Sequence, residues 1–134
     1  GGLTWHGPGQ LVVYPIIHWN KEDEKSVASI IFKLEEWVIE SLSILGIEGY
    51  RDERMQGVWV EGKKICSIGL SFLRWVSRHG LTINYNTPTG RVENLAGCGL
   101  AESTTTSLHQ LNHSVSRQEL EDALLSVYHK CLNR

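Results

Sequence analysis

The chain has 134 residues, a formal net charge of −2, 41% hydrophobic residues and 21% charged residues, which suits one globular domain and argues against a disordered chain. Its thirteen lysines and arginines are scattered rather than clustered, so no basic surface for nucleic-acid binding is expected. Since no apolar run reaches the roughly 20 residues of a membrane span, no membrane segment is predicted either.

The N-terminal part of the chain is predicted to contain a loop, a strand and a long helix. Glycine and proline interrupt residues 1–10, which are therefore expected to form a loop, and the apolar run 11–17 predicts a buried strand. Polar residues 20–23 offer candidates for a helix N-cap. Apolar side chains at i, i+3 and i+4 spacing over residues 27–45 then predict an amphipathic helix that ends at Gly46.

Three more strands are predicted in the middle of the chain. They cover residues 57–60, 65–75 and 81–85, and residues 61–63 are expected to form a hairpin turn between the first two. Short apolar or alternating runs of this kind, bounded by turn residues, are typical of neighbouring strands in an antiparallel sheet.

The last predicted element is a helix that begins after Ser116. Ser116 and Glu119 form an S-x-x-E capping box, and an apolar stripe follows it to the C-terminus. The order strand, helix, strands, helix predicts an α/β (α+β) fold in which helices flank a mixed, largely antiparallel sheet. Residues 1–134 are expected to form a single domain.

The three cysteines contain no C-x-x-C pair, which argues against a disulfide framework or a zinc ribbon and favours a reducing compartment such as the cytoplasm. Cys66 lies inside an apolar strand and Cys131 on the apolar face of the last helix, so both are predicted core residues. Cys98 stands between Gly97 and Gly99, which add no bulk and let backbone N–H groups approach a carbonyl oxygen. A cysteine in such a loop is a candidate nucleophile.

Lys64 is the second candidate for chemistry. It lies at the start of an apolar strand, and period-2 alternation predicts that it shares a face with Cys66 and Ile68. A lysine there is either a solvated residue at a strand end or a positive neighbour that favours a thiolate and transfers protons. The residues alone favour the first interpretation, a solvated lysine at a strand end.

Neither a metal site nor a nucleotide-binding motif is predicted. Of the six histidines, only His109 and His113 have ligand spacing, and they lie in a polar loop without an acidic or cysteine partner. The sequence contains no P-loop, no G-x-S-x-G and no G-x-G-x-x-G that opens a helix.

Four segments, taken in their order and spacing, resemble the lipoyl(octanoyl) transferases. The first covers residues 1–14 and contains T-W-H-G-P-G-Q-L at 4–11. The second joins G-V-W-V at 57–60 to K-K-I-C-S-I-G at 63–69. The third is H-G-L-T-I-N at 79–84, and the fourth is C-G-L at 98–100. The resemblance covers nearly the whole chain, and these pieces are highly specific as a set.

The resemblance implies the fold of biotin and lipoate protein ligases and a ping-pong reaction. The Cys98 thiolate would take an octanoyl (or lipoyl) group from the phosphopantetheine thioester of an acyl carrier protein. A lysine of an apo lipoyl-domain protein, in 2-oxoacid dehydrogenase complexes or the glycine cleavage H protein, would then take it from Cys98 in the first step of protein lipoylation. No cofactor is implied, and a cytoplasmic monomer is expected.

The resemblance also implies roles for particular residues. Lys64 matches the family lysine that lowers the pKa of the cysteine and assists proton transfer. The implied substrate-binding residues come from three segments: Gly1, Gly2, Leu3, Thr4, Trp5 and His6; Ser67, Ile68 and Gly69; and His79, Gly80, Leu81 and Thr82.

Members of this family carry an N-terminal third that has no counterpart ahead of Gly1, so the chain is expected to be truncated relative to the family. Two other functions stay open on the same scaffold. One is a lipoate- or biotin-type ligase, which needs ATP and does not need Cys98. The other is a non-catalytic protein that only binds a lipoyl domain or an acyl carrier protein.

Overall fold

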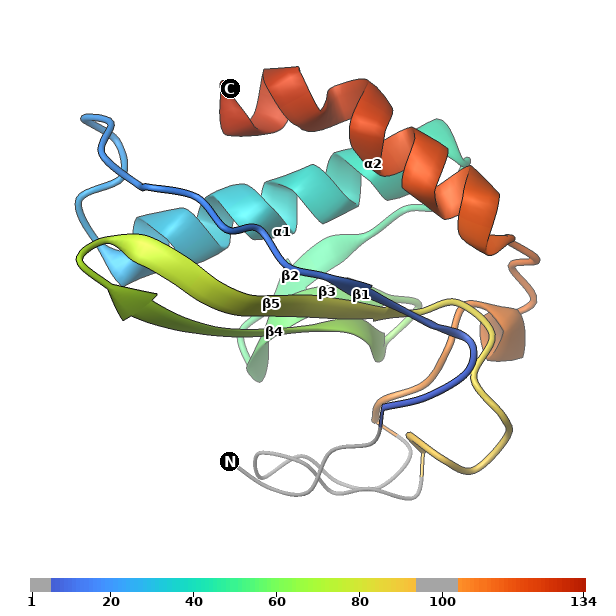
Figure 1. The fold of residues 1–134 in the computed structure, drawn as a ribbon. Coiled ribbons are helices and arrows are strands. Elements are labelled where there is room, and N and C mark those ends of the chain that lie inside the picture. Colours follow the sequence, from blue (N-terminus) through green and yellow to red (C-terminus); the bar gives the residue numbers. More distant parts are fainter. Residues whose placement is uncertain (1–5, 94–103) are drawn as a thin grey trace.

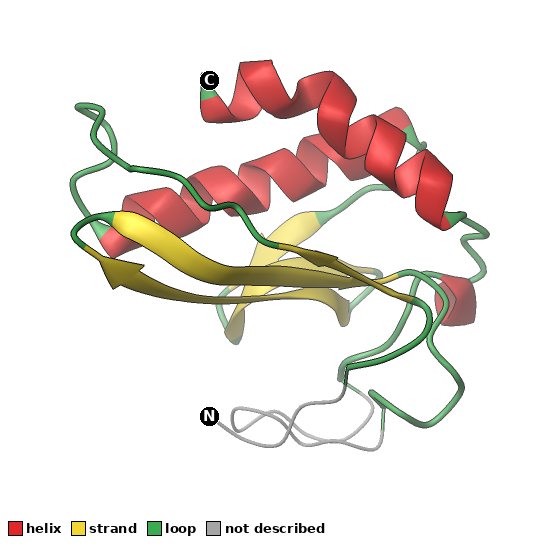
Figure 2. Cartoon of the chain, in the orientation of Figure 1, coloured by secondary structure: helices red, strands yellow, loops and turns green. Residues whose placement is uncertain are grey.

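An antiparallel sheet with helices on one face makes up the fold (Figures 1 and 2). The computed structural model describes residues 6–93 and 104–134. Within these residues the sheet has five strands in the order β1-β5-β4-β3-β2, and all neighbouring strands are antiparallel. The predicted fold class is confirmed. The elements are β1 (Gln10–Val13), α1 (Val27–Ile44), β2 (Tyr50–Asp52), β3 (Met55–Val60), β4 (Lys63–Leu73), β5 (Val76–Asn84), the short 3-10 helix η2 (His109–Leu111) and α2 (Arg117–Leu132).

Helix α1 has the predicted length but a different N-cap. The Ser26 side chain accepts a hydrogen bond from the Ser29 backbone N–H, and the Ser29 hydroxyl reaches back to the Ser26 backbone. The helix ends where Gly46 takes a positive φ of 77°. The prediction of an N-cap at residues 20–23 is wrong because these residues form a turn, in which the Glu24 N–H donates to the Lys21 carbonyl.

Helix α2 begins with the predicted capping box and packs against α1. The Ser116 hydroxyl accepts from the Glu119 N–H at 3.1 Å, and the Glu119 carboxylate accepts from the Ser116 N–H at 3.0 Å. The Trp37 indole of α1 donates to the Leu124 carbonyl at 2.8 Å and meets the Tyr128 ring edge to face. Because α1 covers the sheet and α2 packs beside it, both helices lie on the same side (Figure 1).

Two tight turns connect β3, β4 and β5. The predicted turn before β4 is confirmed, with positive φ at Glu61 and Gly62. The second turn falls at Arg74 and Trp75, which also have positive φ, so β4 ends at Leu73 and β5 begins at Val76. The strands predicted over residues 65–75 and 81–85 are confirmed as β4 and β5, but their predicted bounds at this turn are wrong, because a turn made of arginine and tryptophan lacks the usual glycine or asparagine signal.

The core lies between the sheet and the two helices. Cys66 is fully buried in it, as predicted, and Cys131 is half-buried against its rim. Strand β1 is shorter than the predicted strand 11–17, and β2 was not predicted. In the described part of the chain, neither helix is long and apolar enough to cross a membrane.

Candidate active site

The predicted site residues fall into two groups. Cys98 and the five residues 1–5, among them the predicted Gly1, Gly2, Leu3, Thr4 and Trp5, lie outside the described residues. The described structure contains the other predicted residues: His6, Lys64, Ser67, Ile68, Gly69, His79, Gly80, Leu81 and Thr82.

The β4–β5 ladder brings most of these residues together. Three predicted pairs stand directly opposite one another across the ladder: Ser67 and Thr82, Ile68 and Leu81, and Gly69 and Gly80. Ile68 and Leu81 point into the core beneath the helices. Since successive residues of a strand alternate between faces, half-buried Ser67 and Thr82 and exposed Gly69 lie on the face of the sheet that the two helices leave open.

The two opposed glycines have different surroundings. A Cβ atom on Gly80 would lie 1.9 Å from the Val13 carbonyl oxygen and 2.7 Å from Cδ of Pro15, so only glycine lets the chain after β1 approach β5 this closely. A Cβ atom on Gly69 would have no heavy atom within 4 Å. Gly80 is therefore required by packing, whereas Gly69 leaves open space on the sheet.

Alanine at these two positions is expected to have opposite effects on stability. Gly80→Ala forces apart two strands of backbone and should lower the free energy of unfolding by about 2–3 kcal/mol. Gly69→Ala has an ordinary strand conformation and room for the methyl group, so its stability should stay within about 0.5 kcal/mol of wild type or rise. Urea unfolding followed by tryptophan fluorescence measures both. Equal stability of the two variants would contradict the packing assigned to Gly80.

Lys64 is almost completely buried, at 5% exposed, and its backbone holds another segment of the chain. Its N–H donates to the Thr104 carbonyl at 2.8 Å, and its carbonyl accepts from the Thr106 N–H at 2.9 Å. This parallel bridge is the point at which the chain returns to the sheet after residues 94–103. The interpretation of Lys64 as a solvated strand end is therefore wrong.

A register shift changes the face on which Lys64 lies. Val58 stands opposite Cys66, but the next residue of β3, Trp59, stands opposite Lys64, so β4 has one extra residue at this point. Residues opposite one another share a face of the sheet. The predicted alternation that placed Lys64 in line with Cys66 and Ile68 is interrupted by this bulge, which sets Lys64 with Trp59 instead.

Gly57 and Glu35 support the bulge, and neither was predicted. Gly57 has a φ of 132°, and its N–H donates to the buried Glu35 carboxylate at 2.9 Å. A Cβ atom on Gly57 would lie 2.2 Å from the Cys66 carbonyl oxygen and 3.5 Å from Cδ of Lys64. The close Cys66 carbonyl therefore requires glycine at this position, while the Lys64 side chain lies beside it at an ordinary contact distance. The only sequence signal was a glycine at the start of an otherwise bulky strand.

A chain of hydrogen bonds links His6 to the segment beside Lys64. The Gln10 side-chain oxygen accepts from His6 Nδ1 at 3.2 Å, and its amide donates to Asn84 Oδ1 at 2.8 Å. The Asn84 amide in turn donates to the Thr106 carbonyl at 3.2 Å. Because the Thr106 carbonyl can only accept, it orients the Asn84 amide and through it the Gln10 amide, so that the Gln10 oxygen faces the His6 ring.

Glu93 and Thr104 hold the two ends of the segment that contains Cys98. The Glu93 carboxylate accepts from the Thr106 hydroxyl at 2.6 Å and from the Gly90 N–H at 3.0 Å. The Thr104 carbonyl accepts a hydrogen bond from the Lys64 N–H. The residues that flank 94–103 on either side therefore meet at Thr106 and Lys64, and Gln10, Asn84 and Glu93 had not been singled out for this role by the sequence patterns.

The other cysteines are poor nucleophiles. Burial raises the pKa of the Cys66 thiol to about 12, although the nearby charge of Lys64 acts in the opposite direction. Burial also raises the pKa of Cys131. A thiol that stays protonated at neutral pH does not attack carbonyl carbons at a useful rate. His113 contacts Glu61 at 2.8 Å, so the expectation that it has no acidic partner is wrong. The described residues contain no cluster of three metal-ligating side chains.

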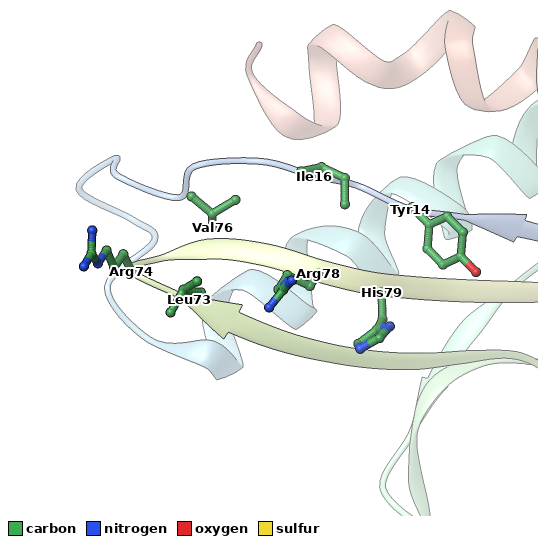
Figure 3. Close-up of a pocket in the computed structure, with 7 residues that line it drawn as sticks. All are labelled: Tyr14, Ile16, Leu73, Arg74, Val76, Arg78 and His79. Carbon is green, nitrogen blue, oxygen red and sulfur yellow. The ribbon is translucent and has the colours of Figure 1, made fainter.

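His79 lies in β5, on the side of the opposed glycines that is nearer to the β4–β5 hairpin turn. It has a positive φ of 62° inside β5, is exposed and stands opposite Leu70. It lines a groove of about 640 Å³ together with residues from β1's continuation and the second hairpin turn (Figure 3). The candidate site therefore runs along the open face of the sheet, from the Lys64 end of β4 to the groove beside His79.

Proteins of similar sequence show the family of this chain. Residues 1–129 match the family described as Lipoyl protein ligase A/B catalytic domain. The chain belongs to this family. It is 39% identical over 128 residues to an octanoyltransferase of Caldanaerobacter subterraneus subsp. tengcongensis, covering 96% of this chain and 56% of that protein. It is 37% identical over 136 residues to an octanoyltransferase of Rickettsia peacockii, covering 97% of this chain and 65% of that protein.

Solved structures of the same fold include ligases for two related cofactors. A bi-partite lipoate protein ligase of Thermoplasma acidophilum, studied with its E2 lipoyl domain, superposes with a TM-score of 0.74 at 20% identity, covering 99% of this chain and 55% of that one. The biotin protein ligase of Aquifex aeolicus superposes with a TM-score of 0.71 at 16% identity, covering 93% and 53%. At these identities the likeness shows the fold. The chain spans a little more than half the length of most of these proteins.

Proposed function

We propose that this chain is an acyltransferase that moves an octanoyl (or lipoyl) group from an acyl carrier protein to a lysine of a lipoyl domain. The observation that carries the proposal is the 35–39% identity to octanoyltransferases over nearly the whole chain. The enzyme acts in the cytoplasm as a monomer, and residues 1–134 belong to a single catalytic domain. Its acceptors are lipoyl domains of 2-oxoacid dehydrogenase complexes and the glycine cleavage H protein.

The reaction has two steps, with Cys98 as the nucleophile. In the first step, the Cys98 thiolate attacks the carbonyl carbon of the carrier thioester, and the carrier thiolate leaves and takes up a proton. In the second step, the neutral amine of the acceptor lysine attacks the Cys98 thioester, loses a proton and expels the Cys98 thiolate. Each step breaks a thioester, and the second step forms an amide. The free energy of the overall reaction is therefore favourable without ATP. Splitting the transfer lets each protein partner dock in turn.

Lys64 is the proton-transfer residue of this proposal. Lys64 is buried on the same face of the sheet as Trp59, and its backbone is hydrogen-bonded to Thr104 and Thr106. Both observations support the assignment, because Thr104 follows Cys98 by only six residues. A buried positive charge near a thiol favours the thiolate. Cys66, which shares the strand, is excluded as the nucleophile by its raised pKa.

The open face of β4 and β5 is the proposed acyl-binding surface. Gly69 leaves space above the sheet, while Ser67 and Thr82 bring only small side chains to the same face. An eight-carbon chain needs a narrow apolar slot, and larger side chains here would fill it. His6 and residues 1–5 complete this surface in the proposal, as does His79 at its outer end.

Intact-mass spectrometry after incubation with octanoyl-acyl carrier protein tests the function. The wild-type chain is expected to gain the mass of one octanoyl group, and Cys98→Ser to gain none. Cys66→Ser is the matched control, because it removes a buried thiol from the same region and should still be acylated. An adduct that persists in Cys98→Ser would overturn the nucleophile, and the absence of any adduct in wild type would overturn the transferase.

The same assay separates the transferase from the other functions on this scaffold. A ligase would require ATP and free octanoate and would modify a lipoyl domain even as Cys98→Ser. A non-catalytic binding protein would retain a lipoyl domain or carrier protein without acyl transfer to either protein.

A further inference from the structure

The groove beside His79 combines exposed apolar and basic side chains. It lies along the tip of the β4–β5 hairpin and the segment that follows β1 (Figure 3). We call it the hairpin groove, and its lining residues are Tyr14, Ile16, Leu73, Arg74, Val76, Arg78 and His79. Tyr14, Ile16 and Leu73 are each about 60% exposed, so an unusual concentration of large apolar side chains faces solvent here.

The charged side chains that line the hairpin groove are all positive. Arg74 and Arg78 contribute two guanidinium groups, and no acidic residue lines the groove. Within residues 6–93 and 104–134, neither arginine forms an ion pair, whereas Arg51, Arg54 and Arg134 each bind carboxylates. On a chain with a net charge of −2, unpaired arginines beside exposed apolar groups are typical of a protein interface.

The backbone of the groove is held in costly conformations. Arg74, Trp75 and His79 all have positive φ, with values of 51°, 65° and 62°. The two-residue hairpin loop requires positive φ at Arg74 and Trp75, whereas His79 has this conformation inside a strand, where side chains other than glycine rarely adopt it. The turn at Arg74 and Trp75 presents both side chains at the hairpin tip.

The distance between the hairpin groove and Lys64 indicates which of the two protein substrates could dock at the groove. Leu70, opposite His79, lies six residues along β4 from Lys64, which is about 20 Å at roughly 3.3 Å per residue. An acceptor lysine has a stem of only four methylenes and cannot cover this distance from a protein docked at the hairpin tip. A long flexible thioester arm can, and it would pass over the open space at Gly69 on the way.

We infer that the hairpin groove is the docking surface for an acidic carrier protein that bears the acyl group on an extended arm. This inference rests on the proposed function for the identity of the acyl donor. The docking surface itself is assigned from the charge of the groove, its exposed apolar side chains and its distance from Lys64. Carboxylates of the carrier pair with Arg74 and Arg78, and its apolar residues cover Tyr14, Ile16 and Leu73. The acceptor lipoyl domain then docks elsewhere, closer to Lys64.

The test compares the double variant Arg74→Gln/Arg78→Gln with the control Lys25→Gln/Arg117→Gln, which removes two exposed charges from other surfaces. Fluorescence anisotropy with a labelled acyl carrier protein measures the dissociation constant over a range of salt concentrations. We expect the groove variant to bind about tenfold more weakly, with a shallower salt dependence, and the control to bind like wild type. Thermal unfolding establishes that both variants fold.

Acyl transfer gives a second, independent measurement. Octanoyl-pantetheine carries the acyl group without a protein, so the ratio of kcat/KM for octanoyl-acyl carrier protein to that for octanoyl-pantetheine should fall about tenfold in the groove variant. If wild type forms no adduct with either donor, the proposed function fails, while the binding experiment still tests the groove.

Three results would overturn the inference. The first is an unchanged dissociation constant for the carrier in the groove variant. The second is weaker binding of the lipoyl domain rather than of the carrier, which would assign the groove to the acceptor. The third is a change in oligomeric state by light scattering, which would assign the groove to a second copy of this chain.

Discussion

Glu24→Gln is expected to lower the free energy of unfolding by about 3 kcal/mol. The Glu24 side chain is fully buried, and its carboxylate accepts from the Arg134 guanidinium at 2.6 and 2.8 Å and from Lys33 Nζ at 2.7 Å. Glutamine has the same size but removes the counter-charge of two largely buried cations, and only Lys33 keeps another partner, the exposed Asp23 carboxylate at 2.9 Å. The cluster joins Arg134 to Lys33 of α1 through Glu24, so removal of the Glu24 charge should destabilise the contact between these two parts of the chain.

The matched control for this variant is Glu22→Gln. Glu22 also pairs with a lysine, Lys25, at 2.9 Å, but both side chains are well exposed. Exposed pairs contribute little, so the control should lose less than about 0.5 kcal/mol. Urea unfolding of the two variants compares a buried with an exposed ion pair in one protein. Equal losses would show that the Glu24 cluster adds nothing beyond a surface pair.

The same cluster should make stability depend on pH in a defined range. The hydrogen bonds from Arg134 are the largest cause that lowers the pKa of Glu24, from its ordinary value of 4.5 to about 2. Because the folded pKa is below the unfolded one, the stabilisation is complete above pH 4.5 and is lost as the pH falls towards 2. This gap corresponds to about 3 kcal/mol. Glu24→Gln should lose this part of the pH profile, and parallel profiles would contradict the assignment.

The sequence was most informative where a local signal determines the structure. The box formed by Ser116 and Glu119, the period of α1 and the turn at Glu61 and Gly62 were all predictable, because each depends on side chains a few residues apart. The second hairpin turn was missed, since Arg74 and Trp75 adopt positive φ against their own preference. Tertiary contacts impose such a turn, and a single sequence does not carry them.

In the candidate site, too, some features were predictable from the sequence and others depend on contacts between distant residues. The resemblance placed Ser67, Gly69 and Thr82 in one site, and the β4–β5 register sets them on one face. The resemblance could not show that Ile68 and Leu81 point the other way into the core. Strict alternation failed at Lys64 because an extra residue in β4 shifts the register. The bulge lies next to Gly57, whose N–H donates to Glu35, a residue 22 positions away, and a local pattern does not carry such a contact.

Lys64→Met is expected to slow alkylation of Cys98 by iodoacetamide at pH 7 by about tenfold or more while the fold is kept. The loss of a neighbouring positive charge raises the pKa of a thiol by about 1–3 units, and the thiolate fraction falls accordingly. Methionine retains the length of the side chain that passes Gly57, so the bulge should remain filled. Lys63→Met removes the adjacent lysine of the same strand and is the control, with an expected rate near that of wild type.

Peptide mass spectrometry can follow Cys98 alone because the other two thiols react slowly. Burial raises the pKa of Cys66 to about 12 and also raises that of Cys131. The decisive readout is the pH profile: the rates of Lys64→Met and wild type should converge above the raised thiol pKa, where both are thiolates. A rate deficit that is the same at every pH would mean that Lys64 shapes access to the thiol rather than its charge. An unchanged profile would remove Lys64 from the mechanism and leave its burial beside Thr104 and Thr106 as a purely structural feature.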